Sequence, residues 1–289
     1  MTKEISILEE SENFPKINFE YFDYKKNNCG SLLLLKIFTY SCMNCLRSLE
    51  FIKKIDKKYR KFGLKTIILH PFEFKFERDI GSIKNAVKKH SIKFPIIIDK
   101  NKRLIKKLGV DFWPADILIK NEKIIYSRIG EGSYKMLENN IIKHLNSAKN
   151  AHRLFSKEPN LSKIPAVYCG CKKKGIIKKY ENSKSKIKFG IIYTEGIWKQ
   201  NNECIKSSNK NRKINSVYIL SKGKSVSVVA GLNGNKSAKL KIYINKHFHK
   251  SIKISGNDIY RIADFSNKKN HIVGLSTKGK IKIYSFAFE

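Results

Sequence analysis

Acidic residues and arginine are both scarce in this sequence of 289 residues. Asp and Glu number 24 against 60 Lys and Arg, the formal net charge is +36, and only 8 of the basic residues are Arg. Arg supplies the planar fork that recognises phosphates and bases, whereas the lysines here are spread over the whole chain. We therefore interpret most lysines as solvated surface and expect no specific nucleic-acid binding. An anionic partner, either nucleic acid or lipid headgroups, stays an alternative.

Long apolar runs are absent as well. No stretch approaches the roughly 20 consecutive apolar residues of a membrane-spanning helix, so we expect no membrane span. The first ten residues, MTKEISILEE, are acidic and lack the apolar core of a signal peptide, which favours a cytoplasmic location. Six cysteines in a chain of this length are too few for a disulfide scaffold.

A second Cys-x-x-Cys motif is also missing, and this bears on the first one, Cys42 to Cys45. Structural zinc needs four ligands, usually from two such pairs or from a pair and two histidines. Cys169 and Cys171 have the wrong spacing to complete a zinc site. An apolar run leads into the motif and a helical pattern leads out, which favours a redox dithiol. Half a zinc site and two unrelated thiols stay open as alternatives.

The predicted position of the motif, between a strand and a helix, assigns a role to each cysteine. The first turn of a helix carries unpaired backbone N–H groups and the positive end of the helix dipole. These groups stabilise a thiolate, which is the reactive form of cysteine. We therefore expect Cys42, at the start of the helix, to be the exposed nucleophile. Cys45, one turn further in, is expected to be the resolving thiol that closes the Cys42–Cys45 disulfide.

The first half of the chain alternates strand and helix patterns, which predicts an α/β domain over residues 1–148 with a central mixed sheet and helices on both faces. The turn at 121–122 makes the last two strands antiparallel. Residues 17–24 alternate weakly and are expected to pair at a sheet edge. This order is the thioredoxin pattern with a helix-bearing insertion after the second core strand. The predicted strands cover 32–38, 64–70, 94–99, 115–120 and 123–129, and the predicted helices cover 42–61, 79–90, 101–108 and 133–145.

The second half of the chain has a different pattern of apolar and polar residues. Residues 149–164 are polar and break the periodicity, so we interpret them as a linker. From 165 to 289, alternating segments rich in Ile, Val, Tyr and Phe are separated by Gly, Asn and Ser every 8–12 residues, which predicts an all-β sandwich. The predicted strands are 187–193, 215–220, 224–231, 239–245, 259–265, 271–276 and 281–288.

Residues 30–145 resemble the thioredoxin-like domain of the DipZ family, which is related to the TlpA-like thiol–disulfide oxidoreductases. The motifs that carry the resemblance are FTYSCMNCLR at 38–47, HPFEFKFE at 70–77, WPA at 113–115 and GEGSY at 130–134. Residues 165–289 look like the C-terminal domain of the same family, a jelly roll similar to carbohydrate-binding modules. There the carrying residues are YCGC at 168–171, NDIY at 257–260 and SFAF at 285–288.

The resemblance implies a cis peptide bond before Pro114 and a substrate groove formed by Pro114 beside Cys42. Tyr40 and Trp113 are expected to flank the dithiol as substrate-binding residues, with simple packing as the alternative. Glu73 follows the second core strand near the edge where ligands collect in such sheets. We predict that its carboxylate accepts the proton of Cys45; Glu77 is the alternative acceptor, and a loop carboxylate paired with Lys is the structural alternative.

The remaining sulfur and imidazole groups are assigned little chemistry. Cys169 and Cys171 are interpreted as small buried apolar residues, and the role of Cys204 is open. His247 and His249 alternate on a strand, but nothing in the sequence brings them to the two cysteines, so no metal site is expected. The redox-active disulfide Cys42–Cys45 takes the place of a cofactor.

The predicted function is thiol–disulfide oxidoreduction on protein disulfides, with the sandwich recruiting a substrate or partner. A thiol-dependent peroxidase of the same fold is one alternative, because Thr39 and Cys42 have Thr-x-x-Cys spacing. A non-catalytic glycan- or polymer-binding protein is another. The family usually carries an N-terminal membrane domain that supplies electrons, and its thioredoxin domain normally works outside the cytoplasm. This sequence lacks that membrane domain, so we expect a separate electron-donor protein, and an extracytoplasmic location stays the alternative.

Overall fold

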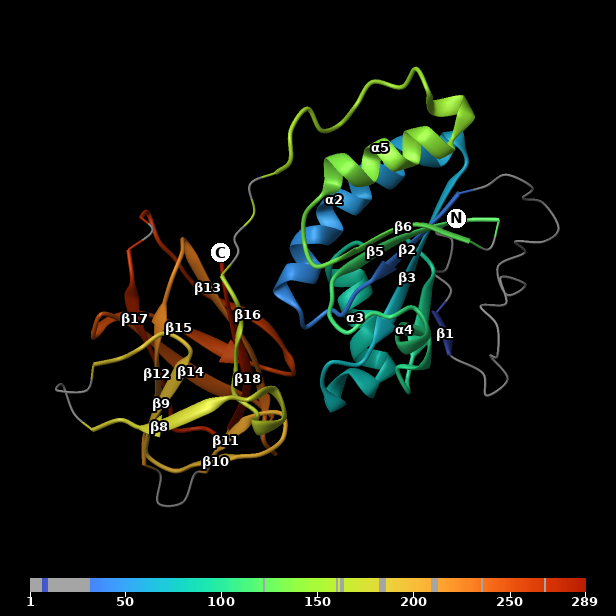
Figure 1. Cartoon of the computed structure of the whole chain (residues 1–289). Coiled ribbons are helices and arrows are strands. Elements are labelled where there is room, and N and C mark those ends of the chain that lie inside the picture. Colours follow the sequence, from blue (N-terminus) through green and yellow to red (C-terminus); the bar gives the residue numbers. More distant parts are fainter. Residues whose placement is uncertain are drawn as a thin grey trace. The chain divides into compact units, whose positions relative to one another are not determined.

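The structure is a computed structural model that describes residues 7–9, 32–121, 123–159, 161, 164–181, 186–208, 213–234, 236–267 and 269–289. The predicted edge strand at 17–24 lies outside these residues. The chain divides into two compact units, residues 1–161 and 162–289, which are described separately (Figure 1). None of the helices in the described part is both long and apolar enough to cross a bilayer.

The first unit is built on a six-stranded mixed sheet with the strand order β1-β4-β3-β2-β5-β6. The pairs β1–β4, β4–β3 and β3–β2 are parallel, and the pairs β2–β5 and β5–β6 are antiparallel. This mixed sheet and its closing hairpin confirm the prediction. The strands are β1 (Ile7–Glu9), β2 (Leu32–Ile37), β3 (Leu64–Pro71), β4 (Ile96–Asp99), β5 (Ala115–Lys120) and β6 (Lys123–Ile129).

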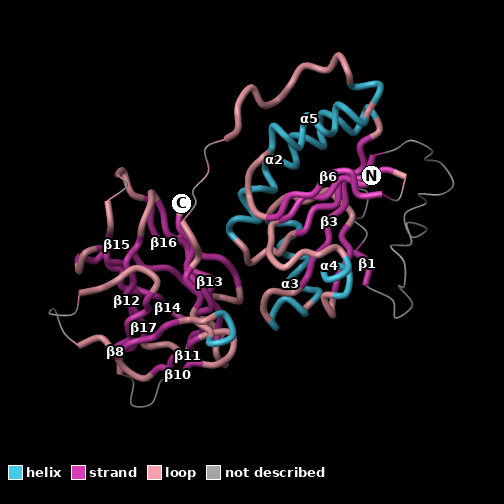
Figure 2. Tube along the Cα trace, viewed as in Figure 1, coloured by secondary structure: helices cyan, strands magenta, loops and turns pink. Residues whose placement is uncertain are grey.

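Helices cover both faces of this sheet, as predicted. The helices α2 (Met43–Tyr59), α3 (Ile80–Lys89) and α5 (Tyr134–His144) bury their apolar residues in one core with Leu32 and Leu34 of β2. The short helix α4 (Arg103–Lys107) packs on the other face with Leu33, Leu35 and Ile37. Because side chains alternate between the two faces of the sheet along β2, this strand contributes residues to both cores. Figure 2 shows α2 and α5 side by side over the sheet.

Two details of the helices do not follow from the sequence pattern. Met136 has helical spacing with the apolar residues of α5, but its side chain is 57% exposed, because Tyr134, Leu137 and Ile141 form the buried stripe. Residues of the predicted linker also pack on α5. The backbone N–H groups of Leu154 and Phe155 donate to the buried carboxylate of Glu138, at 2.7 and 3.0 Å. Sequence periodicity does not reveal such side-chain to backbone contacts.

The second unit consists of two many-stranded sheets around one apolar core, in keeping with the predicted sandwich. The assignment as a jelly roll stays a prediction. One sheet has the order β10-β11-β18-β13-β16, with β7 beside β18, and the other has the order β15-β14-β17-β12-β9-β8. The short strands β7, β8, β10 and β11 have no counterpart in the sequence prediction. The strands are β7 (Val167–Tyr168), β8 (Ile176–Lys179), β9 (Ile191–Glu195), β10 (Trp198–Gln200), β11 (Ile205–Ser207), β12 (Asn215–Ser221), β13 (Ser225–Leu232), β14 (Ala238–Ile244), β15 (His247–Ile254), β16 (Asp258–Asp264), β17 (His271–Thr277) and β18 (Ile281–Phe288).

Candidate active site

The two cysteines of the motif lie at the start of α2, where the sequence places them. Cys42 is the N-cap of the helix, and its Sγ accepts a hydrogen bond from the backbone N–H of Cys45 at 3.4 Å. Cys42 is partly exposed, whereas Cys45 is fully buried. Both are free thiols. One sulfur is therefore open to a partner and the other lies directly behind it, an arrangement suited to nucleophilic attack followed by resolution.

Burial is the main influence on Cys45. Desolvation raises the pKa of this thiol well above its usual value, and the hydrogen bond and charge of Cys42 raise it further. The backbone at Thr39 and the charge of Lys36 act in the opposite direction. Cys45 is thus kept protonated until it is used, and its ionisation needs a proton acceptor or a stabilising charge.

The loop before Cys42 contacts the end of β3 and the segment that follows it through three consecutive residues. Thr39 Oγ1 donates to Glu73 Oε2 at 3.3 Å, and Ser41 Oγ donates to Glu77 Oε1 at 2.6 Å. Between them, the ring of Tyr40 lies 5.7 Å from the imidazole of His70 by their centroids. Because each residue of 39–41 has its own contact, the backbone that presents Cys42 is held at a fixed place.

Glu73 is the predicted proton acceptor, and the structure places it between two site loops. It is half-buried, and its Oε2 also accepts a hydrogen bond from Trp113 Nε1 at 2.8 Å. Glu73 therefore connects the loop before Cys42 with the loop before β5. Trp113 is half-buried and packs against both cores of the unit.

Glu77 is the more deeply buried of the two carboxyl groups. Its side chain has no exposed surface, and it accepts backbone hydrogen bonds from Glu73 and Phe74 as well as the one from Ser41. Burial, followed by the negative charge of Glu73, raises the pKa of Glu77 to about 8. At neutral pH Glu77 therefore holds a proton directly behind the loop of Cys42.

The other predicted site residues also lie in this unit. The Trp113–Pro114 peptide bond is cis, as the resemblance implied, and Pro114 is buried. Its carbonyl accepts from the backbone N–H of Gly130 at 2.8 Å. Tyr40 is 3% exposed, so its ring packs in the core and does not form an open wall. Next to Trp113, Phe112 is 68% exposed, an apolar surface that the sequence analysis did not single out.

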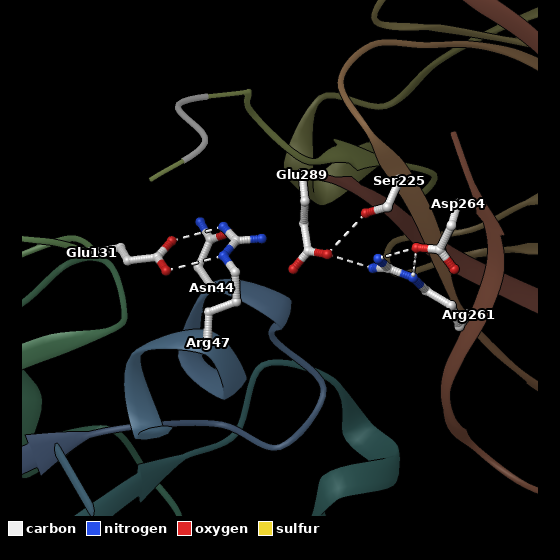
Figure 3. Close-up of polar contacts among 7 residues, drawn as sticks. All are labelled: Asn44, Arg47, Glu131, Ser225, Arg261, Asp264 and Glu289. Carbon is white, nitrogen blue, oxygen red and sulfur yellow. Dashed lines mark hydrogen bonds and ion pairs between the residues drawn. The ribbon is translucent and has the colours of Figure 1, made fainter. Parts of the chain in front are cut away.

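The start of α2 is also tied to the loop after β6 (Figure 3). Arg47 makes a two-pronged contact with Glu131, with Nε–Oε1 and Nη2–Oε2 distances of 3.0 and 2.7 Å, and it donates to Asn44 Oδ1 at 2.7 Å. The side chains of Arg47 and Glu131 are only 16% and 7% exposed. Their bidentate pair braces the helix that carries the dithiol.

The sulfur groups of the second unit do not form a metal site among the described residues, where no group of three or more His, Cys, Asp or Glu could hold a metal ion. Cys169 and Cys204 are buried. Cys171 was predicted to be buried but is exposed, because it opens a short turn and its Sγ donates to Asn202 Oδ1 at 3.3 Å. His247 and His249 are exposed on β15.

Comparison with known proteins finds relatives whose names describe thiol–disulfide chemistry, which is the chemistry that the Cys42–Cys45 pair suggests. The family model described as "Thioredoxin like C-terminal domain" matches residues 170–288. The thiol–disulfide oxidoreductase ResA of Bacillus thuringiensis subsp. konkukian is 32% identical over 141 residues, which cover 47% of this chain and 79% of ResA. Protein DipZ of Mycobacterium tuberculosis is 30% identical over 121 residues, covering 42% of this chain and 17% of DipZ. The protein Suppressor of quenching 1 of Arabidopsis thaliana is 28% identical over 123 residues, covering 42% of this chain and 12% of the relative.

These matches show that the first half of the chain is similar to thioredoxin-like thiol–disulfide oxidoreductases. The chain belongs to the family of ResA, and the same part of it is similar to DipZ. The matched part spans less than a fifth of the length of several of these relatives, among them DipZ and Suppressor of quenching 1.

Proposed function

We propose that this protein exchanges or reduces protein disulfides through Cys42 and Cys45. The observation that carries the proposal is the position of a partly exposed Cys42 at the N-cap of α2, one hydrogen bond from a buried Cys45. The Cys42 thiolate attacks a substrate disulfide and forms a mixed disulfide, and one substrate thiolate leaves. Cys45 then attacks Cys42, the protein disulfide forms, and the second substrate thiolate leaves.

Glu73 is proposed to receive the proton of Cys45 in the second step. Its carboxylate is fixed by donors from two loops of the site, Thr39 and Trp113, so its place is defined while it stays half-exposed to solvent. A carboxylate with access to water can pass the proton on. Replacement by Gln keeps an acceptor for both donors but removes the basic group, so Glu73→Gln should slow resolution and leave the attack by Cys42 unchanged.

We propose that the substrate binds at a surface formed by Phe112 and Trp113, with the buried Pro114 fixing the backbone beside them. An exposed phenylalanine is an apolar surface of the kind that a polypeptide covers. Tyr40 contributes by packing, since it is buried against His70 and Phe76.

The dithiol function has more support than peroxide reduction. A peroxidase would use Thr39 and an arginine to activate Cys42. The Thr39 hydroxyl donates to Glu73, and Arg47 is paired with Glu131. Peroxide reduction by a single cysteine would not use the buried Cys45, whereas disulfide exchange needs it as the resolving thiol.

The second unit is proposed to recruit an acidic protein segment. It has a hollow of about 520 Å³ beside β14 and β17. Among the described residues that line it are three lysines and one tyrosine, and none of them is acidic. The lining includes Lys239, Lys241, Lys278, Tyr243, Ser276 and Thr277. Replacing the three lysines by Ser in the full chain should weaken binding of a polyglutamate peptide. Replacing three exposed lysines elsewhere on this unit, Lys172, Lys179 and Lys199, is the control of equal charge. Equal weakening in both variants would leave only a general charge effect.

Trapping tests the catalytic proposal. With Cys45→Ser, the mixed disulfide on Cys42 has no resolving thiol and should accumulate, visible as a substrate adduct under non-reducing conditions. Cys42→Ser should form none when the exposed Cys171 is replaced by Ser in both variants. Adducts of equal amount on both variants would contradict the assignment of Cys42 as the nucleophile. The cytoplasmic location and the separate electron donor stay predictions, which cell fractionation and capture of partners by Cys45→Ser would check.

A further inference from the structure

A fully buried ion pair lies in the sheet beside the redox site. Lys36 of β2 and Asp116 of β5 are directly opposite each other in the register of the two strands. Their Nζ and Oδ1 atoms are 2.8 Å apart, and the side chains are 0% and 2% exposed. The sequence analysis assigned no role to either residue.

The pair points to the same face of the sheet as Cys45. Side chains alternate along a strand, so Lys36 shares its face with Leu34, and Asp116 shares its face with Leu118. Both leucines belong to the apolar core that contains Cys45, whereas Leu35 and Ile117 belong to the core on the other face. The two charges are therefore buried in the layer between the sheet and α2.

Stability alone does not account for the pair. Removing two charges from water costs as much as or more than their attraction returns, and apolar residues of similar volume often replace a buried pair without loss. A buried pair in this layer therefore calls for another role, and its two ends act on different groups.

The pair is oriented with respect to the site. The charge of Lys36 acts on Cys45 and lowers its pKa, against the larger effect of burial, which raises it. The charge of Asp116, after burial, raises the pKa values of Tyr126 on β6 and Tyr134 on α5. The ammonium end thus favours the thiolate of Cys45, which lies in the same core layer, and the carboxylate end acts on tyrosines of two other elements. The other influences on Cys45 are Cys42, on the same helix, and the backbone at Thr39.

We propose that the Lys36–Asp116 pair is a charged positioning element of the redox site, which stabilises the Cys45 thiolate as it displaces substrate from Cys42. This inference rests on the proposed function. The S–S bond between Cys42 and Cys45 forms while the bond between Cys42 and the substrate sulfur breaks. The substrate sulfur leaves with the bonding electron pair and takes up a proton, the protein dithiol is oxidised, and Lys36 keeps its own proton throughout.

The test separates the two chemical steps with the aromatic disulfide dithiobis-nitrobenzoate. Attack by Cys42 releases one coloured nitrothiolate, and resolution by Cys45 releases the second. Cys171 is exposed, so the experiment uses a Cys29→Ser/Cys171→Ser background in which the described cysteines outside the dithiol, Cys169 and Cys204, are buried. Stopped-flow absorbance then gives a fast first phase and a second phase that reports Cys45.

The decisive variant is the charge swap Lys36→Asp/Asp116→Lys, which keeps an ion pair but turns its field around. A nearby charge commonly moves a pKa by about one unit or more, so the second phase should be about tenfold slower at pH 7. Its pH midpoint should rise, and the first phase should be unchanged. The apolar pair Lys36→Met/Asp116→Leu removes the field and should give a second phase of intermediate rate, and it serves as the test if the swapped protein does not fold.

A folded swap variant with the second phase and pH midpoint of the parent protein would overturn the inference. Failure of both variants to fold would also overturn it, because the pair would then be a structural requirement. A parent protein with no first phase would instead contradict the proposed function itself, since Cys42 would not be a nucleophile.

Discussion

Glu77 offers the sharpest test of the polar contacts behind the dithiol. The replacement Glu77→Gln removes the ionisable group and keeps most of its contacts. The amide oxygen can accept from the backbone N–H groups of Glu73 and Phe74, and the amide NH₂ can donate to Ser41. The substitution therefore changes the titration of this site and little else.

The pH dependence follows from the two states of the carboxyl group. Its pKa rises from the ordinary value of 4.5 to about 8 on folding, first because it is buried and second because Glu73 is near. Between these values the folded protein binds more protons than the unfolded chain, so the free energy of unfolding falls as the pH rises. The interval from 4.5 to about 8, at 1.36 kcal/mol for each pH unit, corresponds to roughly 5 kcal/mol at most.

The assay is urea unfolding at pH 5, 7 and 9, followed by Trp113 fluorescence. Trp198, the other tryptophan, is replaced by Phe in both proteins so that the signal reports the first unit. From pH 5 to pH 9 the Gln variant should gain roughly 3–5 kcal/mol over the parent protein, because only the parent has a carboxyl group that ionises more readily in the unfolded chain than in the folded protein. His70 and all other groups are common to both proteins and cancel. A constant difference across this range would refute the reasoning.

Three further predictions concern the stability of the two units. Glu138→Ala should destabilise the first unit by several kcal/mol in urea unfolding, since the hydroxyl of Tyr59 and two backbone N–H groups lose their buried acceptor. Glu138→Gln should lower the free energy of unfolding much less, and equal destabilisation by both variants would contradict this. Gly170→Ala should destabilise the second unit, because a Cβ there would lie 2.4 Å from the carbonyl oxygen of Asn202; an unchanged melting temperature would contradict it. His70→Leu should remove part of the loss of stability below pH 6.5, because burial lowers the pKa of His70 to about 4 and only the unfolded chain takes up the proton; parallel pH profiles of the two proteins would contradict it.

The first unit could be predicted in detail because its signals are local. Continuous apolar runs predict the buried strands. Gly63, with φ of +102°, ends the helical segment after α2, as glycine commonly does. Asp79, a residue type favoured at helix N-caps, caps α3 and accepts from the N–H of Ser82 at 2.8 Å. Each of these features depends on a few neighbouring residues, so the sequence carries it directly.

The polar contacts of the site could not be predicted in the same way. Ser41 and Glu77 are 36 residues apart, and Lys36 and Asp116 are 80 apart. A loop glutamate and a buried glutamate look alike in sequence, so only the fold distinguishes Glu73 from Glu77. The exposure of Cys171 has the same cause, because it follows from the turn that the chain makes after β7.

Insulin reduction with dithiothreitol as the electron source is the most direct measurement of the central claim. Wild-type protein should accelerate precipitation of the insulin B chain, and Cys42→Ser should be inactive because the only partly exposed sulfur of the described pair is gone. Cys45→Ser should also fail to turn over but should retain a substrate adduct. Turnover by Cys42→Ser equal to that of the wild type would contradict the account.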